Sequence, residues 1–132
     1  IIVIDMGTAT TMSVVDPAGN YIGGTILPGL RISLDTLSSK TAQLPSISLD
    51  IPKKVIGKNT IDCMRSGIMY GNAGMIDGLI DRIEEELGQP ASLVATGGLS
   101  RFIMPLCRHQ IQYDEALMLK GLLILFEKNK NL

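Results

Sequence analysis

The stretch IIVIDMGTATT, residues 1–11, decides the fold of this chain. The aliphatic run Ile1–Ile4 predicts a buried strand that ends in the carboxylate of Asp5. Gly7 then lets the backbone turn closely. The residues that follow supply hydroxyl groups: Thr8, Thr10 and Thr11. A carboxylate and small hydroxyl residues at a tight turn between strands suit a nucleotide phosphate and its attendant cation.

The place of this stretch in the chain leads to an expectation about domains. At 132 residues and 14.2 kDa the chain fits one domain with a core of its own. A ligand-binding loop on the first strand, with nothing in front of it, is typical of half of a larger protein. We therefore expect residues 1–132 to form a single domain, the second half of a two-domain protein whose first domain is absent.

Three strands with short connections are predicted next to one another. Apolar and β-branched runs indicate strands over residues 1–5, 11–16 and 21–26, and Pro17–Asn20 supplies strong turn chemistry. Such strands form an antiparallel meander. Gly23 and Gly24 interrupt the third strand, where a backbone or a ligand could approach closely.

Helices alternate with two further strands in the rest of the chain. Pro28 is expected in the first turn of a helix that runs to about Leu44 and stops at Pro45. The remaining predicted elements are a loop over 46–58, a helix from 60 to 87 capped by Asn59 or Thr60 and ended by Gly88, a strand over 91–95, a helix over 99–106, a strand over 110–113 and a helix from Asp114 to about Lys128.

A meander followed by strand–helix units predicts an α/β fold. We expect a five-stranded mixed sheet with helices on both faces. This is the ribonuclease H-like arrangement that occurs twice in actin-fold sugar and acetate kinases.

Composition excludes several classes of protein. The 12 basic and 13 acidic residues leave a net charge of −1, without the basic stripe of a nucleic-acid surface. No apolar run approaches the length of about 18 residues that a membrane span needs. No charged segment precedes Ile1, so nothing resembles a signal peptide. We expect a soluble, cytoplasmic protein that binds neither nucleic acid nor membrane.

The cysteines and the single histidine do not form a recognisable reactive motif. Cys63 and Cys107 are far apart, and we expect two buried small hydrophobes rather than a disulfide or metal pair. His109 is the only histidine, so a satisfied structural role is favoured over zinc chemistry or a catalytic triad.

Glycines line one stripe of the predicted long helix, at Gly67, Gly71, Gly74 and Gly78. Each costs the helix about 1 kcal/mol relative to alanine, so close packing must offset the loss. The stripe packs either on the domain's own sheet or against a second copy of the chain. We favour a dimer seam, because the neighbouring residues offer more apolar surface than one buried face needs.

Two shorter signals remain open. Thr96-Gly97-Gly98 follows a predicted strand and precedes a helix, an arrangement that aims backbone amides at a phosphate or adenine but also serves plain turns. The pair Lys53-Lys54 is favoured as a solvated edge over an anion site.

Seven segments together resemble type III pantothenate kinase in order and spacing. They are DMGTATT at 5–11, GGTILPGL at 23–30, TAQLP at 41–45, IGKNT at 56–60, SGIMYGNAG at 66–74, ATGGLS at 95–100 and DEALMLKGL at 114–122. The resemblance covers essentially the whole chain. It implies a cytoplasmic homodimer with two actin-type domains, of which this chain is similar to the second.

The resemblance also implies ligands and roles for particular residues. The family phosphorylates pantothenate from ATP, the first step of coenzyme A synthesis, and needs Mg²⁺ and a monovalent cation, K⁺ or NH₄⁺. Asp5 would help hold the monovalent cation, and Thr60 would contact pantothenate. ATP would meet Gly7, Thr8, Gly97 and Gly98. The stripe around Gly67 and Gly71 would lie in or near the dimer interface.

The family's catalytic base does not fall on this chain. The first domain of the family carries a D-x-G-N-T phosphate loop and a G-x-D-R segment whose Asp takes the proton from pantothenate. Neither motif occurs in these 132 residues, so no catalytic residue is expected here. Because phosphoryl transfer depends mostly on positioning and charge neutralisation, the chain is expected to be inactive without the amino-terminal domain.

Two other functions fit the same residues. One is a non-catalytic regulator or accessory factor on the actin fold, which would act through protein binding and dimerisation. The other is an oligomerisation domain whose glycine helix only makes a dimer.

Overall fold

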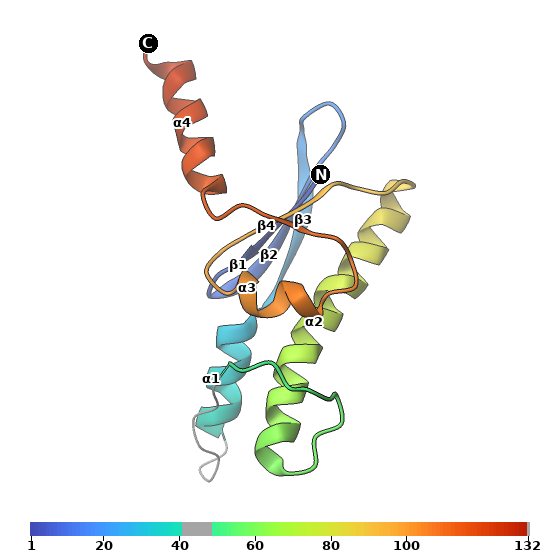
Figure 1. Cartoon of the computed structure of the whole chain (residues 1–132). Coiled ribbons are helices and arrows are strands. Elements are labelled where there is room, and N and C mark those ends of the chain that lie inside the picture. Colours follow the sequence, from blue (N-terminus) through green and yellow to red (C-terminus); the bar gives the residue numbers. More distant parts are fainter. Residues whose placement is uncertain (41–48, 132) are drawn as a thin grey trace.

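The computed structural model describes residues 1–40 and 49–131 (Figure 1). Its centre is one five-stranded sheet in the order β3-β2-β1-β4-β5. The strands are β1 (Ile2–Met6), β2 (Ala9–Val15), β3 (Tyr21–Pro28), β4 (Leu93–Thr96) and β5 (Gln112–Tyr113). The first three pair antiparallel, whereas β4 pairs parallel with β1 and with β5. The α/β class and the mixed five-stranded sheet are therefore confirmed.

The helices follow the predicted order with shifted ends. They are α1 (Leu30–Lys40), α2 (Thr60–Leu87), α3 (Ser100–Ile103), the 3₁₀ turn η1 (Met104–Leu106) and α4 (Leu117–Asn129). The expected end of the first helix at Leu44 and the stop at Pro45 lie outside the described residues. The expected start at Pro28 is wrong, because Pro28 is still paired with Ala9 in the sheet.

The ends of α2 show why this helix could be predicted well. The side chain of Asn59 accepts a hydrogen bond from the backbone N–H of Asp62 at 2.9 Å. At the other end Gly88 adopts a left-handed conformation, with φ of 73°, and its N–H binds the last carbonyls. Asp114, by contrast, is not the N-cap of α4, which is Ala116.

The core lies on one face of the sheet. Alternate residues of β1 and β2 point into it, and α2 covers them, with smaller contributions from α1 and α3. The buried contacts on the sheet side are Ile2, Ile4, Met6, Met12 and Val14, and those on α2 are Ile68, Met69, Ala73, Ile76 and Ile80. This layer fixes β1 and β4 against the helices.

The second face of the sheet differs from the expectation of helices on both faces. Helix α4 has no buried residue and stands away from the sheet (Figure 1). The middle of the second face carries Asp5, Thr11 and Ser13, each partly exposed. The same face also carries Val3 and the exposed Ile26, and α4 does not pack on them.

The glycine stripe of α2 is not used against the chain's own sheet. A Cβ atom added at Gly67, Gly71, Gly74 or Gly78 would meet nothing within 4 Å. The packing that would offset these glycines is therefore not found in the described part of the chain. None of the helices built from those residues is long and apolar enough to cross a bilayer.

Candidate functional site

The expected carboxylate and glycines meet at the ends of β1 and β4. Asp5 and Thr96 are direct neighbours in the parallel register of these strands, so the turns that follow them lie side by side. A Cβ atom added at Gly97 would come within 2.8 Å of Asp5 Oδ1, and one added at Gly7 within 3.6 Å. The carboxylate of Asp5 thus lies between two glycine turns.

The turn after β4 is held in place by its own hydrogen bonds. Leu99 N–H donates to the carbonyl of Met6 at 3.2 Å, and Ser100 Oγ–H donates to the carbonyl of Thr96 at 2.6 Å. Gly97 has a φ of 98°, a conformation that suits glycine. The helix expected over 99–106 is divided into α3, which has four residues, and the 3₁₀ turn η1. A helix this short contributes little dipole, so the backbone of Gly97 and Gly98 matters more than the helix end.

Asp5 is available to a ligand. Its side chain is partly exposed on the second face of the sheet. Among residues 1–40 and 49–131, no group donates a hydrogen bond to its carboxylate. Carboxylate and hydroxyl oxygens are common ligands of hard cations. The arrangement suits a cation that is held by Asp5 and completed by ligand or water oxygens.

The threonines of the opening stretch separate into three environments. Thr8 is exposed in the turn between β1 and β2, next to Gly7. Thr11 lies directly across from Asp5 on β2. Thr10 is only 3% exposed and faces the core, so the expectation that its hydroxyl serves a phosphate is wrong. The alternation of side chains along β2 separates Thr10 from its neighbours.

Thr60 is not brought to the Asp5 cluster within one chain. It is exposed at the start of α2, whose first turns lie well away from the ends of β1 and β4 (Figure 1).

A basic pocket lies beside the start of α2 instead. The segment before α2 is tied to the helix, because Tyr70 Oη–H donates to the carbonyl of Pro52 at 3.0 Å and Ser66 Oγ–H donates to the carbonyl of Val55. The resulting cavity of about 550 Å³ is lined by Lys53, Lys54, Lys58 and Arg65 together with Asp62 and apolar residues. Lys53 and Lys54 are both exposed, as expected of solvated residues, and they also line this hollow, whose positive charge favours anions.

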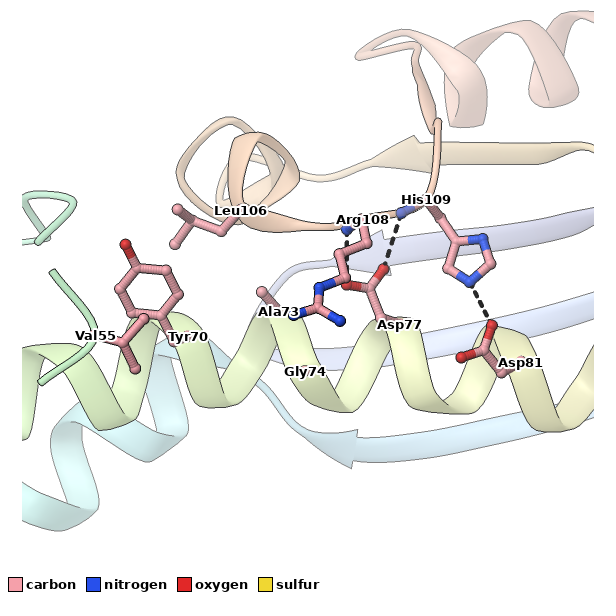
Figure 2. Close-up of a pocket in the computed structure, with 9 residues that line it drawn as sticks. All are labelled: Val55, Tyr70, Ala73, Gly74, Asp77, Asp81, Leu106, Arg108 and His109. Atoms are coloured by element: carbon pink, nitrogen blue, oxygen red, sulfur yellow. Dashed lines mark hydrogen bonds and ion pairs between the residues drawn. The ribbon is translucent and has the colours of Figure 1, made fainter. Parts of the chain in front are cut away.

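A second pocket of about 520 Å³ lies between α2 and residues 106–109 (Figure 2). Asp77 accepts hydrogen bonds from the backbone N–H groups of Arg108 and His109, at 2.8 and 3.2 Å. His109 Nε2 lies 2.6 Å from Asp81 Oδ1. The histidine is therefore satisfied by a neighbour, as expected of a structural residue.

Two residues of this pocket form, with Glu84, a group of the residue types that bind metals. Atoms of Asp81, Glu84 and His109 lie within 4.8 Å of one another. Glu84 already accepts a hydrogen bond from Ala91 N–H at 2.8 Å, and Asp81 pairs with the histidine. These contacts already engage the three side chains, so we interpret the cluster as structural and assign no metal to it.

The cysteines are free and differ from each other. Burial raises the pKa of the Cys107 thiol to about 12, and the nearby Asp77 carboxylate adds to the rise. Cys107 is therefore protonated and unreactive at neutral pH. Cys63 is exposed on the first turn of α2, so the expectation that both cysteines are buried is wrong for this residue.

Comparison with known proteins points to one family. Residues 1–82 match the family model described as type III pantothenate kinase. Proteins of that name in Rhodospirillum rubrum and Moorella thermoacetica are 48% and 45% identical over 130 and 128 residues. These matches cover 98% and 97% of this chain but 51% and 50% of the relatives. The chain spans about half the length of the curated relatives it matches.

A solved structure supports the fold over the whole chain. A protein from Campylobacter jejuni, described as a Baf family transcriptional activator, matches with a TM-score of 0.70 and 26% sequence identity. The match covers 99% of this chain and 59% of that one.

Proposed function

The chain belongs to the type III pantothenate kinase family, and we propose that it is the carboxy-terminal domain of an ATP-dependent enzyme that phosphorylates pantothenate to 4′-phosphopantothenate. This reaction is the first step of coenzyme A synthesis and would take place in the cytoplasm. The observation that carries the proposal is the Asp5 carboxylate, which lies between Gly7 and Gly97 without a donor among the described residues.

The nucleotide site is proposed at these turns. Gly7 and Thr8 would approach the phosphates of ATP, and Gly97 and Gly98 the adenosine. Asp5 would hold a monovalent cation, K⁺ or NH₄⁺, whose charge offsets that of the phosphates. Mg²⁺ would be bound mainly through ATP itself, as is usual for this ion. The parallel register of Asp5 and Thr96 supports one continuous site.

Pantothenate is proposed to bind near the start of α2. The Thr60 hydroxyl group would donate a hydrogen bond to the substrate. Pantothenate carries a carboxylate, and the adjoining pocket with Lys53, Lys54 and Arg65 has the complementary charge. The general base would come from the amino-terminal domain, so this chain alone would bind ligands without turnover.

A homodimer through the glycine helix belongs to the same proposal. Gly67, Gly71 and Gly74 are exposed and have no neighbour within 4 Å of an added Cβ. Beside Gly67 and Gly71 runs an apolar groove of about 440 Å³ between α1 and α2, lined in part by Ile32 and Leu37. A helix from a second copy could approach closely over this surface.

A calorimetric titration with ATP and Mg²⁺, with and without K⁺, tests the nucleotide site. We expect K⁺ to tighten binding at least tenfold in the wild-type chain and to have little effect on Asp5→Asn. Asp16→Asn, in the exposed turn after β2, is the matched control and should retain the K⁺ effect. Binding that is indifferent to both K⁺ and Asp5 would reject the role of this carboxylate.

A regulator on the same fold is the second candidate, favoured by the likeness to the Campylobacter jejuni protein. The two candidates differ in turnover. Supplying this chain with the amino-terminal half of a relative should give ATP-dependent phosphorylation of pantothenate if the kinase proposal is correct. An assembly that is folded but neither binds ATP nor phosphorylates pantothenate would favour the regulator.

A further inference from the structure

Arg101 is an exposed cation close to the Gly97-Gly98 turn, and none of the roles described above uses it. It is the second residue of α3 and comes three positions after Gly98. Its guanidinium group lies over the ring of Phe102, with Cζ 5.0 Å from the ring centroid. Within residues 1–40 and 49–131, no acidic side chain forms an ion pair with Arg101. The described part of the fold therefore leaves this charge without a carboxylate partner.

The ring of Phe102 is a firm support for the guanidinium group. Phe102 is partly buried and packs against the hydrophobic core. A cation over the face of an aromatic ring is attracted by the electrons of that face. Because Arg101 is exposed, the side of the guanidinium group away from Phe102 is open to a ligand.

The winding of the chain after β4 places Arg101 on the same side as Gly98. Two i→i+3 backbone hydrogen bonds, both of 3.2 Å, close successive turns within residues 97–102. Such bonds bring residues that are three apart over one another. The Cα–Cβ bond of a helical residue is also tilted toward the start of its helix, which for Arg101 is the side of Gly98. Gly98 is exposed, with nothing within 4 Å of an added Cβ, so a ligand has room beside it.

The open side of the guanidinium group suits a flat ring better than a phosphate. The N–H groups of arginine lie in the guanidinium plane, so the face opposite Phe102 has no donor to offer to an anion. Nucleic-acid bases do stack on the flat face of arginine. Gly97 adjoins the Asp5 carboxylate, whereas Gly98 and its neighbour Arg101 extend beyond it. The phosphates and their cation are proposed at Asp5, so the base is the part of a nucleotide left for Arg101.

We propose that Arg101, supported by Phe102, is the platform on which the purine base of the nucleotide stacks. The two fused rings of a purine cover more of the guanidinium face than the single ring of a pyrimidine, so the platform favours ATP over UTP. The inference rests on the nucleotide site of the proposed function, where Gly97 and Gly98 meet the adenosine. It adds the side chain that selects the base.

Titration of the 132-residue chain with ATP, UTP and inorganic tripolyphosphate, in the presence of Mg²⁺ and K⁺, tests this proposal. Tripolyphosphate carries the charge of the nucleotide without a base. We expect the wild-type chain to bind ATP about tenfold more tightly than tripolyphosphate and more tightly than UTP. Arg101→Ala should lose about this factor for ATP and bind tripolyphosphate as before. Arg82→Ala, which removes an exposed arginine of α2, is the matched control and should change neither affinity.

A stacked base also gives a signal that a structural role would not. In NMR spectra of the ¹⁵N-labelled chain, the Nε–H signal of Arg101 should move upfield with ATP, because the ring current of the base shields a group above its face. Tripolyphosphate should not move this signal upfield. Arg101→Lys keeps the charge and loses the plane, so it should bind ATP as weakly as Arg101→Ala does.

Three results would overturn the platform. A loss of tripolyphosphate binding in Arg101→Ala as large as the loss of ATP binding would mean that Arg101 holds phosphate. Full ATP affinity in Arg101→Lys would mean that charge and not stacking is used. A wild-type chain that binds ATP no better than tripolyphosphate, or binds neither, would mean that no base is held here. Because Arg101 is exposed, all variants should keep the circular dichroism of the wild type.

Turnover separates this proposal from the function itself. In an assembly with the amino-terminal half of a relative, Arg101→Ala should raise the KM for ATP about tenfold and leave kcat within about twofold. If ATP binds as expected but the assembly does not phosphorylate pantothenate, the platform stands and the kinase proposal fails. If the assembly is active and Arg101→Ala changes neither the ATP affinity nor the KM, the platform fails and the kinase proposal stands.

Discussion

Gly97 lies directly against the carboxylate of Asp5, with no space between them for a side chain. A Cβ atom added at Gly97 would come within 2.8 Å of Asp5 Oδ1 and within 2.6 Å of the carbonyl oxygen of Met6. The φ of 98° at Gly97 is also unfavourable for any L residue. The turn after β4 and the carboxylate at the end of β1 are therefore one packed unit.

Gly97→Ala should therefore disturb the centre of the proposed nucleotide site. We expect a loss of about 2 to 3 kcal/mol in the free energy of unfolding, because the backbone strain and the contact with Met6 cannot both relax. Gly98→Ala is the matched control, with nothing within 4 Å of its added Cβ, and should change stability by less than about 0.5 kcal/mol. Urea unfolding of both variants measures the difference, and equal stabilities would contradict the packing described here.

The parts of the fold predicted correctly from sequence are those set by local patterns. The aliphatic run Ile1–Ile4, the cap at Asn59 and the glycine at position 88 each act within a few residues. The meeting of Asp5 with Gly97 follows from the parallel pairing of β1 with β4, which the local patterns did not predict. The resemblance to a known family added the roles of these residues.

What the sequence could not predict depends on contacts between distant residues. The burial of Thr10 depends on which face of β2 meets α2, and the exposure of Cys63 on the outward direction of its helical turn. The position of α4 could not be inferred from its apolar sequence, which is equally suitable for packing on its own sheet or elsewhere. The hollow beside Lys53 and Lys54 arises because Tyr70 and Ser66 draw the preceding loop onto α2.

The two cysteines should differ strongly in reactivity. With a pKa of about 12, Cys107 is almost entirely thiol at pH 8, with a thiolate fraction on the order of one in ten thousand. Cys63 is exposed, although its Sγ lies 3.3 Å from the carbonyl of Gly57. Iodoacetamide in native buffer should modify Cys63 first, and Cys107 only after unfolding. Mass spectrometry of the modified chain measures both rates. Equal rates in the native chain would show that Cys107 is not buried as described.

The turn after β2 should make stability sensitive to acid. A hydrogen bond from the backbone N–H of Asn20, together with further hydrogen bonds from the Asn20 side chain and the Ala18 backbone, lowers the pKa of Asp16, although desolvation by burial opposes this shift. A lowered pKa in the folded state stabilises the protein above the unfolded value, and this contribution is lost as pH falls through the folded pKa.

Asp16→Asn should therefore be less stable than wild type at pH 7, and the difference should shrink as the pH falls through the lowered folded pKa of Asp16. Asp35→Asn, an exposed position on α1, should run parallel to wild type throughout. Thermal melting followed by circular dichroism, from pH 7 into the acid range, measures both differences. A difference for Asp16→Asn that stays constant with pH would mean that the charge of Asp16 does not support the turn.

A substitution in the glycine stripe should affect the stability of the single chain and the stability of its dimer in opposite directions. Gly71 is exposed in the middle of α2, and an added Cβ meets nothing within 4 Å. Gly71→Leu should therefore raise the stability of the isolated helix by about 0.5 to 1 kcal/mol, because leucine forms helices better than glycine. In a close seam the same leucine would hold two backbones apart, so the dimer should dissociate.

Sedimentation velocity of Gly71→Leu beside Glu86→Leu separates these effects. Both variants add a leucine to an exposed position of α2, but Glu86 lies beyond the stripe. We expect a monomer for Gly71→Leu with an unchanged or higher melting temperature, and a dimer for Glu86→Leu and for wild type. A dimer that survives Gly71→Leu would place the contact elsewhere, and a Gly71→Leu monomer that melts earlier than wild type would show that the stripe packs within the chain after all.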